Sequence, residues 1–182
     1  MHMKQEVIGT ISGLIFALLA TSAQATTVYL APGDADFEGS DPNNPNASDV
    51  SDIVGVPGLL SLYKDDAGGS ENGSFADNYT TTYDYEPDPE DATITWDGGD
   101  SISCPECFLV VKDGSHDPIW YIFDIGNWDG MMDIELTGFW PDQGAISHVE
   151  IVGGVIPVPA AVWLFGSGLL GLVGVARRRK NV

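Results

Sequence analysis

Residues 107–125 read CFLVVKDGSHDPIWYIFDI, two apolar runs on either side of a polar turn. The runs at 108–111 and 119–125 are apolar at almost every position, which is typical of strands at the centre of a two-layer β structure. Between them, Lys112-Asp113-Gly114-Ser115 has the residue types that turns favour. The stretch therefore predicts an antiparallel hairpin whose two strands are buried.

Shorter runs in the rest of residues 26–156 alternate apolar and polar residues with the period of a strand. Strand-like runs lie at 27–30, 53–63, 79–85, 92–96, 132–136 and 145–151. His148 is expected on the outward side of the last run. Residues 32–52 are rich in Gly, Pro, Asn and Asp and are expected to form a long loop. Because no helical pattern of comparable strength occurs in this segment, we predict an all-β, antiparallel β-sandwich or jelly-roll-like ectodomain over residues 26–156.

Acidic residues dominate the same segment. All of the chain's 27 Asp and Glu residues except Glu6 lie there, against only Lys64 and Lys112, so the segment has a formal charge of −24. A surface of this sign repels nucleic acid and anionic lipid headgroups, which bind through Lys and Arg side chains. We therefore expect no nucleic-acid partner.

The N-terminus has the three parts of a secretion signal. Lys4 is positively charged, residues 7–20 form a short apolar run, and Ala23-Gln24-Ala25 matches the small-x-small pattern that signal peptidase reads. We expect residues 1–25 to be a signal peptide with a signal helix, cleaved after Ala25. A buried N-terminal helix is the alternative, but it does not explain the Ala-x-Ala ending.

The C-terminus combines an apolar run with a basic tail. Residues 160–176 are 17 residues without a charge, and they are followed by Arg177, Arg178, Arg179 and Lys180. As a helix the run would extend about 25 Å, which is at the lower limit for crossing a bilayer. Trp163 lies near its start, where an aromatic ring favours the membrane interface. The positive-inside rule predicts a transmembrane helix with the tail in the cytoplasm and the acidic domain outside.

A short proline motif precedes this helix and consists of Ile156, Pro157, Val158, Pro159 and Ala160. The order of proline motif, Gly-rich apolar helix and terminal arginines resembles the PEP-CTERM sorting signals of Gram-negative bacteria, in the VPLPA-type variant. The resemblance implies that residues 157–182 are a sorting signal cut by an exosortase, a membrane cysteine transpeptidase. The domain would be held transiently in the inner membrane and would end at the cell surface or outside the cell. A permanent anchor is the alternative.

Cys104 and Cys107 are the only two cysteines of the chain. In an oxidising exterior a nearby pair usually forms a disulfide, here one that pins the turn before the 108–111 run. A redox pair would need its first cysteine at the start of a helix, and a zinc site would need two more ligands at a recognisable spacing. Both stay open as alternatives to the structural disulfide.

The stretch Asp34-Ala-Asp36-Phe-Glu38-Gly39 starts like a calcium-binding loop. It then departs from the pattern, because Pro45 occupies the position of the bidentate glutamate. A solvated acidic face is the simpler interpretation, and a calcium ion with unassigned ligands is the alternative. No cofactor is expected to be required.

Two tryptophans beside turns, Trp128 and Trp140, are candidates for exposed rings that stack on sugars, and burial in the core is the alternative. No Gly-x-Ser-x-Gly elbow or His-Glu-x-x-His helix occurs in the chain, and we expect no enzyme activity. The predicted role is structural or adhesive, in the cell envelope or an extracellular polysaccharide matrix. The alternatives are a calcium-dependent carbohydrate-binding module and an envelope polysaccharide hydrolase.

Overall fold

The computed structural model describes residues 26–154 apart from residues 86, 104 and 142–144. The predicted signal peptide and sorting signal lie outside the described residues and stay predictions. This applies to Ala23, Ala25, Pro157, Val158, Pro159, Ala160, Trp163, Arg177, Arg178 and Arg179. Within the described ranges, no helix is long and apolar enough to span a bilayer.

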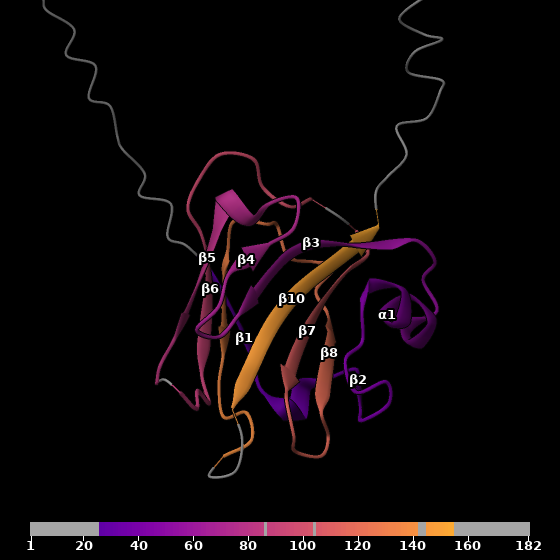
Figure 1. Ribbon diagram of the computed structural model, residues 1–182. Coiled ribbons are helices and arrows are strands. Elements are labelled where there is room, and N and C mark those ends of the chain that lie inside the picture. Colours follow the sequence, from indigo (N-terminus) through magenta and orange to yellow (C-terminus); the bar gives the residue numbers. More distant parts are fainter. Residues whose placement is uncertain (1–25, 86, 104, 142–144, 155–182) are drawn as a thin grey trace, which may run out of the picture.

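Two β-sheets pack against each other around a shared core (Figure 1). The strand order is β1-β9-β6-β5 in the four-stranded sheet and β2-β8-β7-β10-β3-β4 in the six-stranded sheet. The strands are β1 (Thr27–Leu30), β2 (Phe37–Gly39), β3 (Leu59–Asp66), β4 (Glu71–Asn72), β5 (Tyr79–Tyr83), β6 (Ala92–Trp96), β7 (Cys107–Asp113), β8 (Trp120–Asp124), β9 (Asp133–Leu136) and β10 (Ile146–Gly154). The helices are η1 (Pro32–Asp34), α1 (Ala47–Val54) and η2 (Ala76–Asn78). The expected β-rich class is therefore confirmed.

The predicted hairpin is formed by β7 and β8, which pair antiparallel. β10 pairs with the other edge of β7, so β7 lies inside the sheet with a neighbour on each side. Every residue of β7 is buried, because both faces of the strand are covered. Leu109 and Val111 belong to the core between the two sheets, whereas Val110 packs in a second cluster beneath α1. Burial on both faces explains why this run lacks polar alternation.

One strand pairing departs from the predicted antiparallel arrangement. β1 runs parallel to β9 at the edge of the four-stranded sheet, with Val28 opposite Ile134 and Leu30 opposite Leu136. The two strands lie far apart in the sequence, so no short turn fixes their relative direction. The alternation that turns Val28 and Leu30 toward the core suits either direction. The prediction of purely antiparallel pairing is wrong at this edge.

Residues 47–54 form α1, where the sequence pattern predicts the end of a loop and the start of a strand. Asn46 caps the helix by accepting hydrogen bonds from the backbone N–H groups of Ser48 and Asp49, and the Asp49 carboxylate accepts from the N–H of Asn46. Gly55, at φ 75°, ends it in the left-handed conformation. With only eight residues, α1 is too short to give a clear helical period in the sequence.

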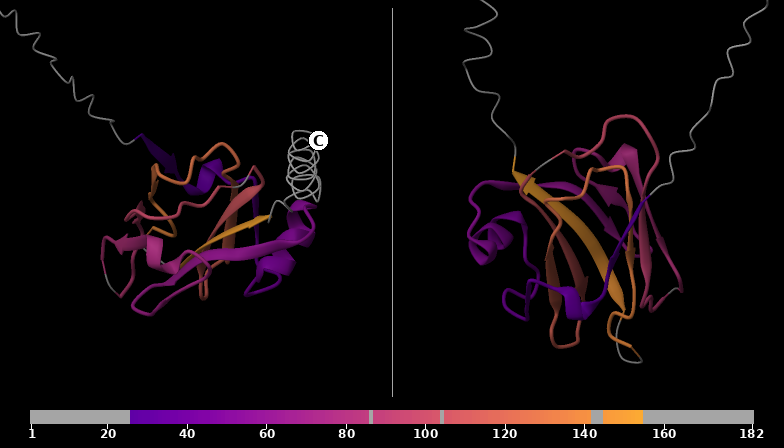
Figure 2. Two further views of the ribbon diagram at one scale, coloured as in Figure 1. Left: turned by 90° about the horizontal axis from the view of Figure 1, so that it is seen from above. Right: turned by 180° about the vertical axis from the view of Figure 1, so that it is seen from behind.

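The helix α1 covers part of the outer face of the six-stranded sheet. Val50 is fully buried against a cluster that includes Val110, Ile122 and Val152 from three strands of that sheet. Figures 1 and 2 show α1 on the side of β7 and β8. The six-stranded sheet is therefore apolar on both faces where α1 lies. In an ordinary sandwich the outer face of each sheet is exposed to solvent and polar.

The core between the sheets predicts a strong contrast between two aliphatic side chains. Ile151 on β10 is fully buried, whereas Leu60 on β3 is 52% exposed. We expect Ile151→Ala to lower the free energy of unfolding by about 2–5 kcal/mol, because it removes buried methyl groups and leaves a cavity. The matched change Leu60→Ala is expected to cost less than about 1 kcal/mol. Urea denaturation of both variants measures this, and equal losses would contradict the assignment of the core.

Candidate functional site

A cavity lies at one end of the sandwich, where three segments meet. They are η1, the loop between β7 and β8, and the loop between β9 and β10, all at the lower end of Figure 1. The cavity has a volume of about 650 Å³ and is open to solvent. Its lining residues are Pro32, His116, Asp117, Tyr121, Gly138, Trp140 and Pro141. We refer to it as the end cavity.

Aromatic rings form the apolar wall of the end cavity. The ring centroids of Tyr121 and Trp140 are 5.2 Å apart, and Phe139 lies 5.6 Å from Tyr121 and 5.8 Å from Trp140. Phe139 is fully buried and supports the two lining rings from the core side. These tilted and edge-on arrangements fix the ring orientations, so the wall is preorganised before any ligand arrives.

Trp140 has a backbone conformation that is uncommon for a large side chain. Its φ angle is 47°, in the left-handed region, and it is the one non-glycine residue with positive φ among the described residues. Its indole N–H donates a 2.7 Å hydrogen bond to the carbonyl of Pro118, which ties the β9–β10 loop to the β7–β8 loop. Such strained positions persist only where surrounding contacts hold them, and they concentrate at ligand-binding sites.

The expectation that Trp128 and Trp140 are exposed is wrong, since each is only 6% exposed. Trp128 packs 5.8 Å from Tyr79 in the core, and its indole N–H donates to the carbonyl of Met132 at 2.7 Å. In both residues a neighbouring turn folds the ring inward, where its N–H finds a backbone carbonyl. Trp140 still lines the end cavity, but Trp128 does not.

Polar groups face the same cavity from the β7–β8 loop. His116 Nδ1 lies 2.7 Å from a carboxylate oxygen of Asp113, which orients the imidazole ring. The Asp117 carboxylate accepts a hydrogen bond from the hydroxyl of Ser40. Burial raises the pKa of Tyr121, and the negative charges of Glu38 and Asp117 raise it further. The Tyr121 hydroxyl therefore stays protonated. The cavity offers the small accessible parts of the largely buried Trp140 and Tyr121 rings, hydroxyl and imidazole hydrogen-bonding groups and a carboxylate.

The sequence patterns do not identify His116, Asp117 or Tyr121 as site residues. His116 reads as a turn residue and Tyr121 as part of a buried strand. They meet Trp140 only because the β7–β8 and β9–β10 loops reach the same end of the sandwich. The sequence does show one of the lining residues, Trp140, as an aromatic residue beside a turn.

The structure gives little information on the other predicted sites, which are the disulfide and the calcium site. Cys107 is buried at the start of β7, but Cys104 lies outside the described residues, so the disulfide stays a prediction. The carboxylates of Asp34 and Asp36 accept hydrogen bonds from the backbone N–H groups of Ala31 and Asp124, at 3.0 and 2.7 Å. Among the described residues, no group of three or more His, Cys, Asp or Glu side chains is placed to hold a metal ion. Calcium binding stays a prediction without assigned ligands.

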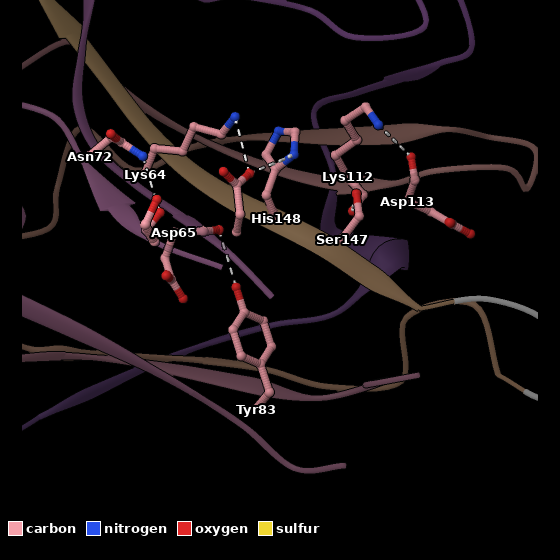
Figure 3. Close-up of polar contacts among 10 residues, drawn as sticks. Lys64, Asp65, Asn72, Tyr83, Lys112, Asp113, Ser147 and His148 are labelled. Carbon is pink, nitrogen blue, oxygen red and sulfur yellow. Dashed lines mark hydrogen bonds and ion pairs between the residues drawn. The ribbon is translucent and has the colours of Figure 1, made fainter. Parts of the chain in front are cut away.

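A second polar feature lies on the outer face of the six-stranded sheet. Figure 3 shows Lys64, His148 and Lys112 on one side of the sheet, with Tyr83 approaching from the other side. The three residues come from β3, β10 and β7, and they include both lysines of residues 26–156. His148 pairs across the strands with Asp66 and with Lys112. We call Lys64, Asp66, Lys112 and His148 together the basic row.

The lysine charges of the basic row have polar partners nearby, and His148 at its centre is buried. Lys64 Nζ lies 3.2 Å from a carboxylate oxygen of Asp66, and Lys112 Nζ donates to the carbonyl of Asp113 at 2.9 Å. His148 lies on the face of its strand that points away from the main core, as expected, but it is nevertheless buried, with 4% of its surface exposed. Burial, together with the charges of Lys64 and Lys112, lowers the pKa of His148 to about 4. The imidazole is therefore neutral at neutral pH.

Comparisons with protein-family models, with curated proteins and with solved structures found no match for this chain. The geometry of the end cavity is therefore the feature from which we infer a function. Unlike the basic row, this cavity is open to a ligand.

The buried imidazole predicts a pH dependence of stability. The pKa of His148 is about 4 in the folded protein and about 6.5 in an unfolded chain. Above pH 6.5 neither state binds the proton; as the pH falls from 6.5 to 4, only the unfolded state binds it. Stability is therefore lost over this window, by about 3 kcal/mol in total.

The variant His148→Gln isolates this effect. The contribution from the buried Glu150, whose pKa is raised by burial, is largely common to both proteins. Urea denaturation between pH 7 and pH 4 should show a steeper loss for the wild type than for the variant. Parallel curves would show that His148 is not buried in its neutral form.

Proposed function

We propose that this protein is an exported, non-catalytic domain of the cell surface or extracellular matrix that binds polysaccharide through the end cavity and so has an adhesive role. The observation that carries this proposal is the pairing of the Trp140 and Tyr121 rings with the Asp117 carboxylate in one open cavity. Small-molecule sites are typically concave and aromatic, with a few polar groups that fix orientation.

Sugars match this combination of groups. A sugar ring has an apolar face of C–H groups that packs on an aromatic ring, and its hydroxyls hydrogen-bond to carboxylates and imidazoles. Asp117 and His116 lie on the same short loop, so they would contact one sugar together. The hydrogen bond from Trp140 to Pro118 holds this loop against the aromatic wall, which limits the entropy lost on binding.

Export is the second part of the proposal and rests on the two ends of the chain. The signal-peptide pattern over residues 1–25 and the PEP-CTERM-like pattern over residues 157–182 would carry the domain across the inner membrane and to the exterior. In that oxidising environment Cys104 and Cys107 would form the disulfide at the start of β7. A formal charge of −24 over residues 26–156 suits a domain whose self-repulsion is screened by external salt.

Binding is tested with the purified full chain on immobilised chitosan, dextran and alginate, which are cationic, neutral and anionic polymers. We expect retention on at least one of them and no release of shortened sugar products. Trp140→Leu is expected to weaken binding at least tenfold, because it removes the aromatic wall. The matched change Trp96→Leu lies outside the end cavity and should leave binding unchanged.

Thermal melting of both variants separates lost binding from lost folding. Asp117→Asn, which keeps the side-chain shape, is the second test if Trp140→Leu unfolds, and it should also weaken binding. The absence of retention on all three polymers, or equal binding by wild type, Trp140→Leu and Asp117→Asn, would contradict the proposal.

The export hypothesis predicts the ends of the mature protein. Intact-mass analysis of the protein recovered from its native host should show a chain that begins at Thr26 and lacks residues 163–180. It should also show a mass two hydrogens below that of the reduced form, from the disulfide. A protein that begins at Met1 and retains Trp163 in the cytosol would contradict export.

A further inference from the structure

A second, smaller depression lies on the outer face of the four-stranded sheet. It has a volume of about 140 Å³ and is open to solvent. Its polar lining comes from β5, β6, β9 and residues directly next to these strands, and consists of Thr82, Asp84, Asp91, Thr93, Glu135 and Thr137. We call it the face depression.

Three residues that line the face depression belong to a straight row of side chains across the sheet. Thr82 pairs with Thr93, Thr93 pairs with Glu135, and Glu135 pairs with Tyr29. Neighbouring strands are about 4.8 Å apart, so these four positions span about 14 Å. Tyr29 is 67% exposed at the edge of the sheet. The row thus presents two hydroxyls, a carboxylate and an aromatic ring in line on one face.

The two depressions adjoin each other. Thr137 lines the face depression, and the next residue, Gly138, lines the end cavity. The short wall between them is held in place on both sides: the N–H of Thr137 donates to the carbonyl of Leu30 at 3.0 Å, and the N–H of Gly138 donates to the Asp91 carboxylate at 2.7 Å. Apart from its chain neighbours, no atom lies within 4 Å of the position that a Cβ would take on Gly138, so the space beside this residue is open.

The charges that line the two depressions have one sign. Asp84, Asp91 and Glu135 line the face depression, and Asp117 lines the end cavity. One oxygen of Asp84 and one of Asp91 accept backbone N–H groups, which leaves the second oxygen of each carboxylate out of these bonds. Lys64 and Lys112, the lysines of residues 26–156, lie on the outer face of the other sheet. An anionic polymer would therefore be repelled from both depressions.

We propose that the end cavity and the face depression are two subsites of one binding site for a linear polysaccharide that carries free amines. This inference rests on the proposed function and specifies its ligand. One sugar packs on the rings of Trp140 and Tyr121, and the chain continues over Gly138 onto the face depression. There the ammonium groups of the polymer make charge-assisted hydrogen bonds to Glu135, Asp84 and Asp91, which are stronger than neutral hydrogen bonds. The hydroxyls of Thr82 and Thr93 bond to those of the sugar.

Chitosan oligomers of two and six sugars test the two subsites at mildly acidic pH, where the sugar amines are charged. We expect the hexamer to bind the purified full chain at least tenfold more tightly than the dimer, because only the hexamer reaches both depressions. The fully N-acetylated hexamer should bind at least tenfold more weakly than the amine-bearing one. Added salt should weaken the amine-bearing hexamer most.

Two substitutions on β9 provide a matched pair. Glu135→Gln removes a charge inside the face depression and should lower the affinity for the chitosan hexamer about tenfold without changing the affinity for the dimer. Asp133→Asn removes a charge on the same strand outside the face depression and should change neither. Both residues are partly exposed, so both variants are expected to fold.

The outcomes separate this inference from the proposed function. If the N-acetylated hexamer or dextran binds as well as the amine-bearing hexamer, the ligand class is wrong. If dimer and hexamer bind equally, or if Glu135→Gln has no effect, the second subsite is wrong, while a loss of binding in Trp140→Leu would still support the end cavity. If Trp140→Leu and Asp117→Asn both bind every polymer normally, the proposed function fails as well.

Discussion

Burial of β7 on both faces is the constraint on which the rest of the structure depends. One face packs through Leu109 and Val111 against the four-stranded sheet, and the other packs through Val110 beneath α1. Because β8 and β10 pair with its two edges, β7 leaves no backbone group to solvent along most of its length. The two sheets, the helix and the hairpin are therefore stabilised by the same short apolar run.

The proposed binding surface lies at one end of this packed core. Tyr121 and Phe139 belong to the core between the sheets, and Tyr121 also lines the end cavity together with residues of η1, of the β7–β8 loop and of the segment 138–141. Among the residues that the structure describes, the two lysines lie away from the end cavity, since Lys64 and Lys112 belong to the basic row on the outer face of the six-stranded sheet. The proposed binding surface at one end is thus acidic and aromatic, whereas the basic row is a charge-paired, largely buried polar row elsewhere.

Local patterns predict the strands well and the site poorly. The hairpin at 107–125 and the alternating runs at 92–96 and 132–136 are strands, because periodicity is a property of neighbouring residues. The parallel pairing of β1 with β9 depends on a contact between distant segments, which no local pattern reports. The helix α1 is set by capping at Asn46 and Gly55 more than by an apolar period.

The same distinction applies to individual side chains. Trp140 is identified in the sequence as a ligand-binding candidate, but its burial and its contact with Tyr121 depend on how two loops meet. Trp128 has the same local setting, an aromatic residue beside a turn, and lies in the core. His148 points away from the main core as the alternation predicts, and it is nevertheless buried because the outer face of its sheet is covered.

Binding at the end cavity can be followed through the indole N–H signals in a two-dimensional NMR spectrum. Titration of the ¹⁵N-labelled protein with a chitosan hexamer should shift the signal of Trp140, whose ring lines the end cavity, and leave those of Trp120 and Trp128 in place. A titration that reaches saturation without moving the Trp140 signal, or that moves only the signals of the core tryptophans, would contradict binding at the end cavity.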